Sequence, residues 1–237
     1  MKIAVVVPHR NAGKWLKRCL DSLDARFMVF PIDDDALQVG VAGARNKGLQ
    51  EALDAGADYI TFLDADDTFA PDAYGQMEAA IKEAGGEPLV QLNHLRVMPT
   101  GDKWPRMPND RGIYELDHLP QLWMSVCNKV IRADLVKDIR FPVGLRHGED
   151  EIFVLSCLQK ARRIYNSQRV ALHYHKDNPK SLSSSTTSED LFGEQVALLE
   201  MLYDYLEDKE LCEAIRGRQA ELWKNATYKR VFGGSKK

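Results

Sequence analysis

A short apolar run that ends in three carboxylates is the stretch of this chain whose residue types could do chemistry. Tyr59–Leu63 is rich in β-branched and aromatic residues, and Asp64, Asp66 and Asp67 follow it directly. Carboxylates at the end of a buried strand repel one another and resist desolvation unless a cation meets them there. Such oxygen ligands suit Mg²⁺ or Mn²⁺. The sequence therefore predicts a divalent metal site here, the alternative being an ordinary solvated Asp-rich turn.

Two further acidic clusters could face the same crevice. Asp33, Asp34 and Asp35 follow the apolar run Phe27–Ile32, and Glu149-Asp150-Glu151 opens a predicted helix. Because parallel strands place their carboxyl ends on one edge, we expect the clusters that follow strands to lie together. A nucleoside diphosphate with Mg²⁺ or Mn²⁺ would relieve the repulsion among these groups. A favourable cap on the helix dipole is the alternative for the glutamate and aspartate that open the helix.

A segment of small and cationic residues lies between the first two acidic clusters. Ala42, Gly43 and Ala44 allow the start of a helix to approach a ligand or the sheet closely. Arg45 and Lys47 place cations near the amino end of that helix, which is a natural site for a phosphate. Helix packing explains the small residues equally well, and surface solvation explains the lysine.

The elements that must position these residues alternate in the first half of the chain. Expected strands are Ile3–Val7, Phe27–Ile32, Tyr59–Leu63, Leu89–Val97 and Arg163–Tyr174; expected helices are Lys14–Leu23, Ala42–Leu53, Asp72–Glu83, Leu116–Trp123, a turn and helix at Val130–Asp138, and one opening at Glu149. The order predicts an α/β fold with a parallel sheet and right-handed crossovers. The Ser- and Thr-rich Ser181–Ser188 is expected to be a mobile loop, and Asp190–Val231 to be helical.

Composition narrows the class of protein. The chain has 237 residues and a net charge of −3, so no global field draws it to nucleic acid or anionic membrane. Its four cysteines are scattered and form neither a disulfide framework nor a zinc site, which predicts reduced thiols in a cytoplasmic protein. No run approaches the ~20 apolar residues of a membrane span. A basic tail could bind phosphates, although most such tails are merely solvated: Trp223, Lys224, Tyr228, Lys229, Arg230, Lys236 and Lys237.

Several segments, in order, resemble the blocks of family 2 glycosyltransferases. The donor-side segments are Val5–Leu16 (VVVPHRNAGKWL), Ala44–Leu49 (ARNKGL) and Asp58–Asp67 (DYITFLDADD); Asn128–Arg132, Ile139–Pro142 and Gly148–Phe153 are similar to acceptor-side blocks. The resemblance covers about Lys2 to Ser183. It implies a GT-A-like fold, a mostly parallel sheet flanked by helices, over residues 1–183, and leaves residues 184–237 as a helical C-terminal extension.

The activity that the resemblance implies is metal-dependent, inverting transfer of a sugar. The donor would be a nucleotide-sugar, most readily a UDP-sugar, and the acceptor a hydroxyl of a saccharide or glycan. Transfer onto a hydroxymethylated pyrimidine in DNA is one alternative. Nucleotidyl transfer and a non-catalytic nucleotide-sugar-binding module are the others, and the absence of a Gly-rich phosphate loop after the first strand disfavours nucleotidyl transfer.

The resemblance also implies roles residue by residue. Asp34 with Asp33 would contact the nucleobase, Asp64 would lie near the ribose, and Asp66 of the DXD motif would ligate Mn²⁺ or Mg²⁺. The whole donor-binding set is Pro8, Arg10, Asn11, Asp33, Asp34, Arg45, Asp64 and Ala65. Asp150, with Glu149 beside it, would be the general base that takes a proton from the acceptor hydroxyl.

Histidines and aromatic residues complete the candidates. His173 and His175 point the same way in a strand, and His175 could ligate the metal, the alternative being an ordinary polar strand end. Trp104, Trp123 and His147 are candidates for an acceptor pocket because sugars stack on aromatic faces, although a core position is the simpler expectation for Trp123.

Overall fold

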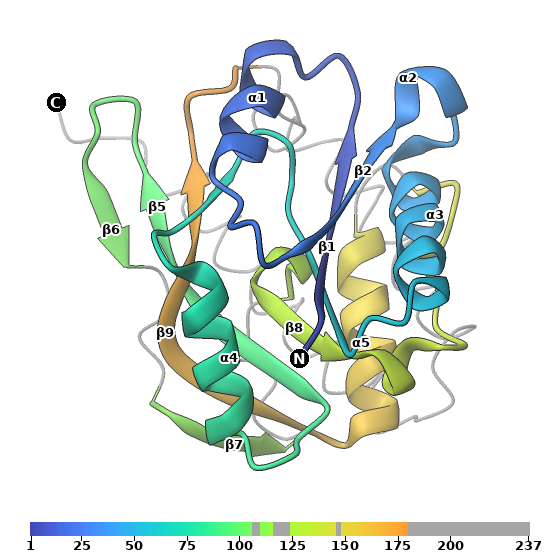
Figure 1. Ribbon diagram of the computed structural model, residues 1–237, viewed down its shortest axis with the longest axis vertical. Helices are drawn as coiled ribbons and strands as arrows, with labels where there is room; N and C mark the ends of the chain where they lie inside the picture. The colour runs from blue at the N-terminus through green and yellow to red at the C-terminus, as the bar shows by residue number, and fades with distance from the viewer. Residues whose placement is uncertain (106–109, 116–123, 146–147, 180–237) are drawn as a thin grey trace, which may run out of the picture.

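One mixed sheet with helices on both faces makes up the computed structural model, which describes residues 1–105, 110–115, 124–145 and 148–179 (Figure 1). Within these residues the sheet has nine strands, and its main path runs β2-β1-β3-β8-β5-β9-β4, with β6 on β5 and β7 on β9. The strands are β1 (Ile3–His9), β2 (Met28–Asp33), β3 (Tyr59–Phe62), β4 (Thr68–Phe69), β5 (Leu89–Val97), β6 (Lys103–Pro105), β7 (Gly112–Glu115), β8 (Lys129–Arg132) and β9 (Arg163–His175).

The helices follow the expected order. They are α1 (Gly13–Asp21), α2 (Asp34–Leu37), α3 (Gly40–Asp54), α4 (Ala73–Glu83) and α5 (Glu149–Ala161), with short 3₁₀ helices η2 (Val126–Asn128) and η3 (Ala133–Val136). None of the helices in the described ranges is long and apolar enough to cross a membrane. The predicted helix Leu116–Trp123, the loop Ser181–Ser188, the helix Asp190–Val231 and the extension 184–237 lie outside the described residues, so the proposed domain division stays a prediction.

The direction of the strands agrees with the expected α/β order, with one insertion. Strands β1, β2, β3, β5 and β9 all point the same way, because β1 pairs in parallel with β2 and β3, and β5 with β9. Between β3 and β5 lies β8, which is antiparallel to both. The sheet is therefore mixed, and its parallel strands still present their carboxyl ends along one edge.

The insertion of β8 corrects the prediction of a turn and helix at Val130–Asp138. Lys129–Arg132 is a strand, and only Ala133–Val136 is helical, as a 3₁₀ turn. Ile131 pairs with Ile60 on one side and Leu89 on the other. Pairing with both neighbours stabilises this short segment as a strand, and four residues are too few to show a period in the sequence.

The helices lie in two layers. α1 and α4 lie on one face, where Phe27 contacts the Tyr74 ring at 5.0 Å between centroids (Figure 1). Because β1–α1–β2 and β2–α3–β3 run in opposite directions across the sheet, right-handed crossovers place α3 on the other face. α3 packs closely there, since a Cβ on Gly48 would lie 2.3 Å from Val6 Cγ1.

α5 lies beside α3 on this second face. Phe153 of α5 stacks on Phe141 at 3.8 Å between centroids, and Phe62 of β3 meets Phe141 edge-on at 5.1 Å. The residues Ile3–Val7 of β1 are fully buried between the two layers, as the continuous apolar run indicates. This packing fixes the start of α5 next to the carboxyl end of β3.

Candidate active site

A buried arginine joins the end of β3 to the start of α5. Arg45 Nη2 donates to Asp64 Oδ1 at 2.8 Å, and Nη1 donates to Glu149 Oε1 at 2.6 Å. The arginine is 4% exposed, and Glu149 is also buried. The sequence placed Arg45 at a phosphate, but both of its terminal nitrogens are engaged by carboxylates. We therefore interpret Arg45 as a bridge between two parts of the site, and its contact with a phosphate stays a prediction.

Asp150 follows the bridge directly and has the environment of a base. Its side chain is partly buried, and Oδ1 accepts a hydrogen bond from the Glu151 backbone N–H at 2.9 Å. Burial and the adjacent Glu149 charge raise the pKa of Asp150 to about 6, against the opposing effect of Arg45. A carboxylate with a pKa near neutrality is suited to take a proton at physiological pH. The Glu149 carboxylate instead forms the ion pair with Arg45. It therefore stabilises the start of α5 beside the predicted base.

The charges of Asp64 and Asp150 act on a common neighbourhood. Asp64 contributes to raising the pKa of Asp150. Burial, Asp64 and Asp150 together raise the pKa of the buried Cys127 thiol well above its ordinary value, and Arg45 opposes them. The geometric link between Asp64 and the start of α5 is Arg45, which bonds to both Asp64 and Glu149.

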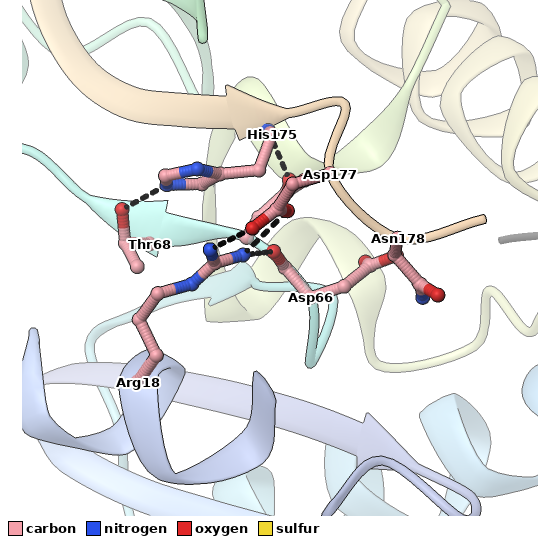
Figure 2. Close-up of polar contacts among 7 residues, drawn as sticks. Arg18, Asp66, Thr68, His175, Asp177 and Asn178 are labelled. Atoms are coloured by element: carbon pink, nitrogen blue, oxygen red, sulfur yellow. Dashed lines mark hydrogen bonds and ion pairs between the residues drawn. The ribbon is translucent and has the colours of Figure 1, made fainter. Parts of the chain in front are cut away.

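The turn after β3 is held by residues that the sequence analysis did not single out. Asp66 Oδ2 accepts from Asn178 Nδ2 at 2.8 Å, and the Asp66 carbonyl accepts from Arg18 Nη2 at 2.6 Å. Arg18 also donates two hydrogen bonds to the Asp177 carboxylate, from Nη1 to Oδ2 at 2.5 Å and from Nη2 to Oδ1 at 3.1 Å. Figure 2 shows that these contacts fasten the segment after β9 to the acidic turn.

Burial shifts the titration of the acids in this turn. Desolvation, followed by the negative charge of Asp64, raises the pKa of Asp66. The same two causes raise the pKa of Asp67 well above its ordinary value, although its Oδ1 accepts the His175 backbone N–H at 2.8 Å. A cation near this turn would offset the cost of ionising both groups.

A metal at this turn would need ligands beyond the side chains of the turn. Within the described residues, no group of three or more His, Cys, Asp or Glu side chains could hold an ion by itself. Asp64 Oδ1 accepts a hydrogen bond from Arg45, and one oxygen of Asp66 accepts a hydrogen bond from Asn178. An ion that took one carboxylate from Asp66 and its other oxygens from a diphosphate and water would fit, which is how Mg²⁺ is commonly bound.

His175 does not face this carboxylate. Its Nε2 lies 2.9 Å from Thr68 Oγ1, and Figure 2 shows the ring turned toward Thr68 and away from Asp66. Burial, with Arg18 nearby, lowers the pKa of His175 to about 4. The geometry therefore does not support the predicted role of His175 as a metal ligand. The direction of the ring follows from strand alternation, and the group it contacts on that side is the Thr68 hydroxyl.

The predicted donor-side residues come together at the ends of β1 and β2. His9 pairs with Asp33 in register, so Pro8, Arg10 and Asn11 lie beside the first acidic cluster. Arg10 Nη1 is 3.8 Å from Asp34 Oδ2, with 59% of its side chain exposed. Three backbone N–H groups also donate to this cluster: Asn11 to Asp35 Oδ2 at 2.7 Å, Val39 to Asp34 Oδ1 at 2.8 Å, and Asp35 to Asp33 Oδ1 at 2.9 Å.

These internal bonds shape the loop before α3, and a nucleobase contact by Asp33 or Asp34 stays a prediction. Ala65, between Asp64 and Asp66, is buried. Of the acceptor-side candidates, Trp104 on β6 is 61% exposed, whereas Trp123 and His147 lie outside the described residues.

An open groove of about 830 Å³ lies elsewhere, between α1, β4 and the end of β9. Lys17, Arg18, Thr68, His173 and His175 are among its lining residues. It borders the far side of the acidic turn, and the lining does not include Asp64, Asp66 or Asp150. This groove is thus separate from the carboxylates of Asp64, Asp66 and Asp150.

The residues that sequence reasoning missed are Arg18, Asp177 and Asn178. Arg18 reads as a solvated position of an amphipathic helix, and Asp177-Asn178 as a polar strand end. Their contact partners are remote in the chain: Asn178 and Asp66 are separated by 112 positions. The one available signal was the position of Asp177 and Asn178 just after a strand that points toward the ligand-binding edge.

Comparison with known proteins shows a likeness to glycosyltransferases. Residues 36–139 match the model of glycosyl transferase family 2. The chain is 25% identical over 240 residues to the poly(ribitol-phosphate) β-N-acetylglucosaminyltransferase TarS of Staphylococcus aureus, covering 84% of this chain and 40% of that protein. It is 30% identical over 133 residues to an uncharacterized glycosyltransferase of Haemophilus influenzae, covering 54% of this chain and 50% of the relative.

Solved structures agree with the fold. The crystal structure of S. aureus TarS 1–349 in complex with UDP-GlcNAc superposes with a TM-score of 0.71 at 22% identity, covering 89% of this chain and 69% of that one. The chain spans 40% and 50% of the length of the two curated relatives named above. Over residues 36–139 the chain thus matches glycosyl transferase family 2, and its mixed α/β sheet has the GT-A fold of the TarS structure.

Proposed function

We propose that this protein transfers a sugar from a UDP-sugar to a hydroxyl of a saccharide or polyol acceptor, with inversion at the anomeric carbon. The observation that carries the proposal is the Arg45 bridge, which holds Asp64 at the donor side and Glu149 next to Asp150. The bridge therefore connects Asp64, near which the donor would lie, to the helix that carries Asp150, a carboxylate of raised pKa. UDP-GlcNAc is the donor we expect, because the related TarS was solved with it.

Asp150 is the base in this proposal. Its carboxylate accepts the proton of the acceptor hydroxyl while the hydroxyl oxygen forms a bond to the anomeric carbon. The bond from that carbon to the diphosphate oxygen breaks, and the electron pair leaves with UDP. One displacement of this kind inverts the anomeric configuration. Because the pKa of Asp150 lies at about 6, most of this carboxylate is unprotonated near pH 7.

Asp66 is the residue that would hold Mn²⁺ or Mg²⁺. When bound, the ion supplies positive charge to the diphosphate as it departs. Asn178 orients the Asp66 carboxylate through its amide, and Arg18 holds the backbone of the same residue. Hydrogen bonds of this kind around a metal-binding carboxylate support both its orientation and its affinity for the ion.

The test measures UDP release from UDP-GlcNAc with Mn²⁺ in the presence of a panel of saccharide and polyol acceptors, one hydroxymethylated DNA duplex and a no-acceptor blank. Asp150→Asn should lower turnover by at least about 100-fold while the affinity for UDP-GlcNAc is kept. Asp66→Ala should lower turnover and also weaken the dependence on Mn²⁺. Asp138→Asn, whose carboxylate is 90% exposed, is the matched control and should match the parent protein.

Each competing function has its own result in this assay. Turnover with the DNA duplex alone would select the nucleic-acid acceptor. UDP-GlcNAc binding without turnover in the parent protein would identify a non-catalytic module. Equal turnover in the parent protein and both active-site variants would refute the roles assigned to Asp66 and Asp150.

A further inference from the structure

Three residues on neighbouring strands form a row, and of these only Trp104 was a candidate from the sequence. Arg96 of β5 pairs directly with Trp104 of β6 on one side and with Tyr174 of β9 on the other. Side chains of directly paired residues project from the same face of a sheet. The row therefore consists of Trp104 on β6, Arg96 on β5 and Tyr174 on β9. Trp104, at its outer end, is 61% exposed.

Strand alternation shows which face carries the row. His173 and His175 line the groove beside α1, so Tyr174 between them points to the opposite face. That opposite face is the one on which α3 and α5 lie, joined by the ion pair between Arg45 and Glu149. The row and the predicted base are thus on the same face of the sheet.

The row also lies at the same edge as the predicted base. β5 and β9 point in the same direction as β1 and β3, and Arg96 and Tyr174 each stand one residue before the end of their strand. Asp64 follows the end of β3, and Asp150 lies in the first turn of the helix tied to Asp64 through Arg45. In Figure 1 the β5–β6 hairpin and the end of β9 lie side by side at this edge.

The row is cationic as well as aromatic. Arg96 Nε is shielded from solvent and has no hydrogen-bond partner, and no carboxylate pairs with this arginine among the residues described. Lys176 adds a second cation, with Nζ 4.4 Å from the Tyr174 ring centroid and 2.5 Å from its hydroxyl. A buried donor without a partner costs stability, so an acceptor supplied by a ligand would be favoured there.

These features match one class of ligand. The face of an exposed indole packs well on a sugar ring or an extended polyol, while a guanidinium with a planar fork binds phosphate or carboxylate. We propose that Trp104, Arg96 and Tyr174 form an acceptor platform for a saccharide or polyol that carries a phosphate or carboxylate. The inference rests on the proposed function, because it assigns the acceptor class of that same site.

The test compares three small probes that differ in charge alone or nearly so: sorbitol, sorbitol 6-phosphate and gluconate. Binding to the full chain is followed by NMR titration of the probe signals. Sorbitol 6-phosphate or gluconate should bind about tenfold or more tightly than sorbitol, as one added charged hydrogen bond provides. The stronger of the two anionic probes identifies phosphate or carboxylate as the recognised group.

Variants locate the binding on the platform. Arg96→Gln should abolish the preference for the charged probe, and Arg96→Lys should keep only part of it because lysine lacks the planar fork. Trp104→Ala should weaken all three probes, whereas Trp104→Phe should retain most of the affinity. Ile113→Ala removes an apolar side chain that is 52% exposed on β7, and Lys17→Gln removes a charge on α1; both should bind like the parent protein.

Equal affinity for sorbitol and both charged probes, or a charge preference that survives Arg96→Gln, would overturn the platform. Tighter binding of a short thymidine oligonucleotide than of either charged polyol would overturn the saccharide assignment. Sorbitol, sorbitol 6-phosphate and gluconate contain no nucleotide, so failure of the two proposals is distinguishable. A charge preference lost in Arg96→Gln, in a protein that never turns over UDP-GlcNAc, would uphold the platform and reject the transfer reaction.

Discussion

Replacing Arg45 with methionine should lower the free energy of unfolding by about 3 to 5 kcal/mol, the cost of leaving a buried charge without its partner. The side chains of Arg45 and Glu149 are 4% and 9% exposed, and Nη1 lies 2.6 Å from Oε1. Methionine fills much of the volume but supplies no charge. Water can take over the contact at Asp64, which is 38% exposed, so most of the loss arises at Glu149.

Urea unfolding of four proteins tests this magnitude: the parent, Arg45→Met, Glu149→Gln and the double variant. The double variant should recover at least about 2 kcal/mol relative to Arg45→Met, because an uncharged amide replaces the stranded carboxylate. Arg26→Met is the matched control. Its ion pair with Asp24 is also short, at 2.7 Å, but the arginine is 50% exposed, so the same substitution should change stability by about 1 kcal/mol or less.

The reasoning would be refuted if Arg45→Met and Arg26→Met cost the same, since burial would then not distinguish the two ion pairs. It would also be refuted if Glu149→Gln gave no recovery in the Arg45→Met background. In that case the loss would come from packing of the arginine stem against its neighbours, and the bridge between the donor side and α5 would lose its electrostatic basis.

The raised pKa of Asp150 predicts that kcat increases about tenfold per pH unit at acidic pH and levels off above about 6, because the base must be unprotonated; a plateau that begins near 4 would contradict this. The same shift contributes stability that is fully present below the ordinary value of 3.8 and is lost as pH rises through about 6, so Asp150→Asn should flatten stability over that window in urea titrations. Gly48→Ala should cost about 1 to 3 kcal/mol because the new Cβ would lie 2.3 Å from Val6 Cγ1. In Gly75→Ala the new Cβ meets only the movable carboxylate of Asp72, so the free energy of unfolding should stay within about 1 kcal/mol of that of the parent protein in urea titrations. Equal losses in the two variants would show that the contact between α3 and β1 is not tight.

The order of elements and the edge at which the acids gather could be predicted from the sequence. Ile3–Val7 reads as a buried strand because it is continuously apolar, and it is fully buried. The alternation of strands and helices set the direction of the parallel strands. From that direction alone, Asp33 and Asp64 were expected at one edge, and both follow or end parallel strands there. These features depend on local pattern and chain order.

The partners of individual side chains could not be predicted in the same way. Arg45 was expected to meet a phosphate, yet Glu149, 104 positions away, is one of its partners. His175 was expected near the metal, but the residue that contacts Asp66 is Asn178, three positions further along. Strand alternation predicts the face of the sheet from which the His175 side chain projects. It does not predict which residue the side chain contacts on that face.

What the amino-acid pattern determined by itself is therefore a set of strands, their direction and the acidic ends they bring together. Only the tertiary structure decided that Lys129–Arg132 is a strand, that Arg45 is a bridge, and that Trp104, Arg96 and Tyr174 share a row. The physical reason is the separation along the chain over which each kind of interaction acts. Burial patterns and turn residues act over a few positions, whereas pairing register and ion pairs depend on segments that meet only after the whole sheet has assembled.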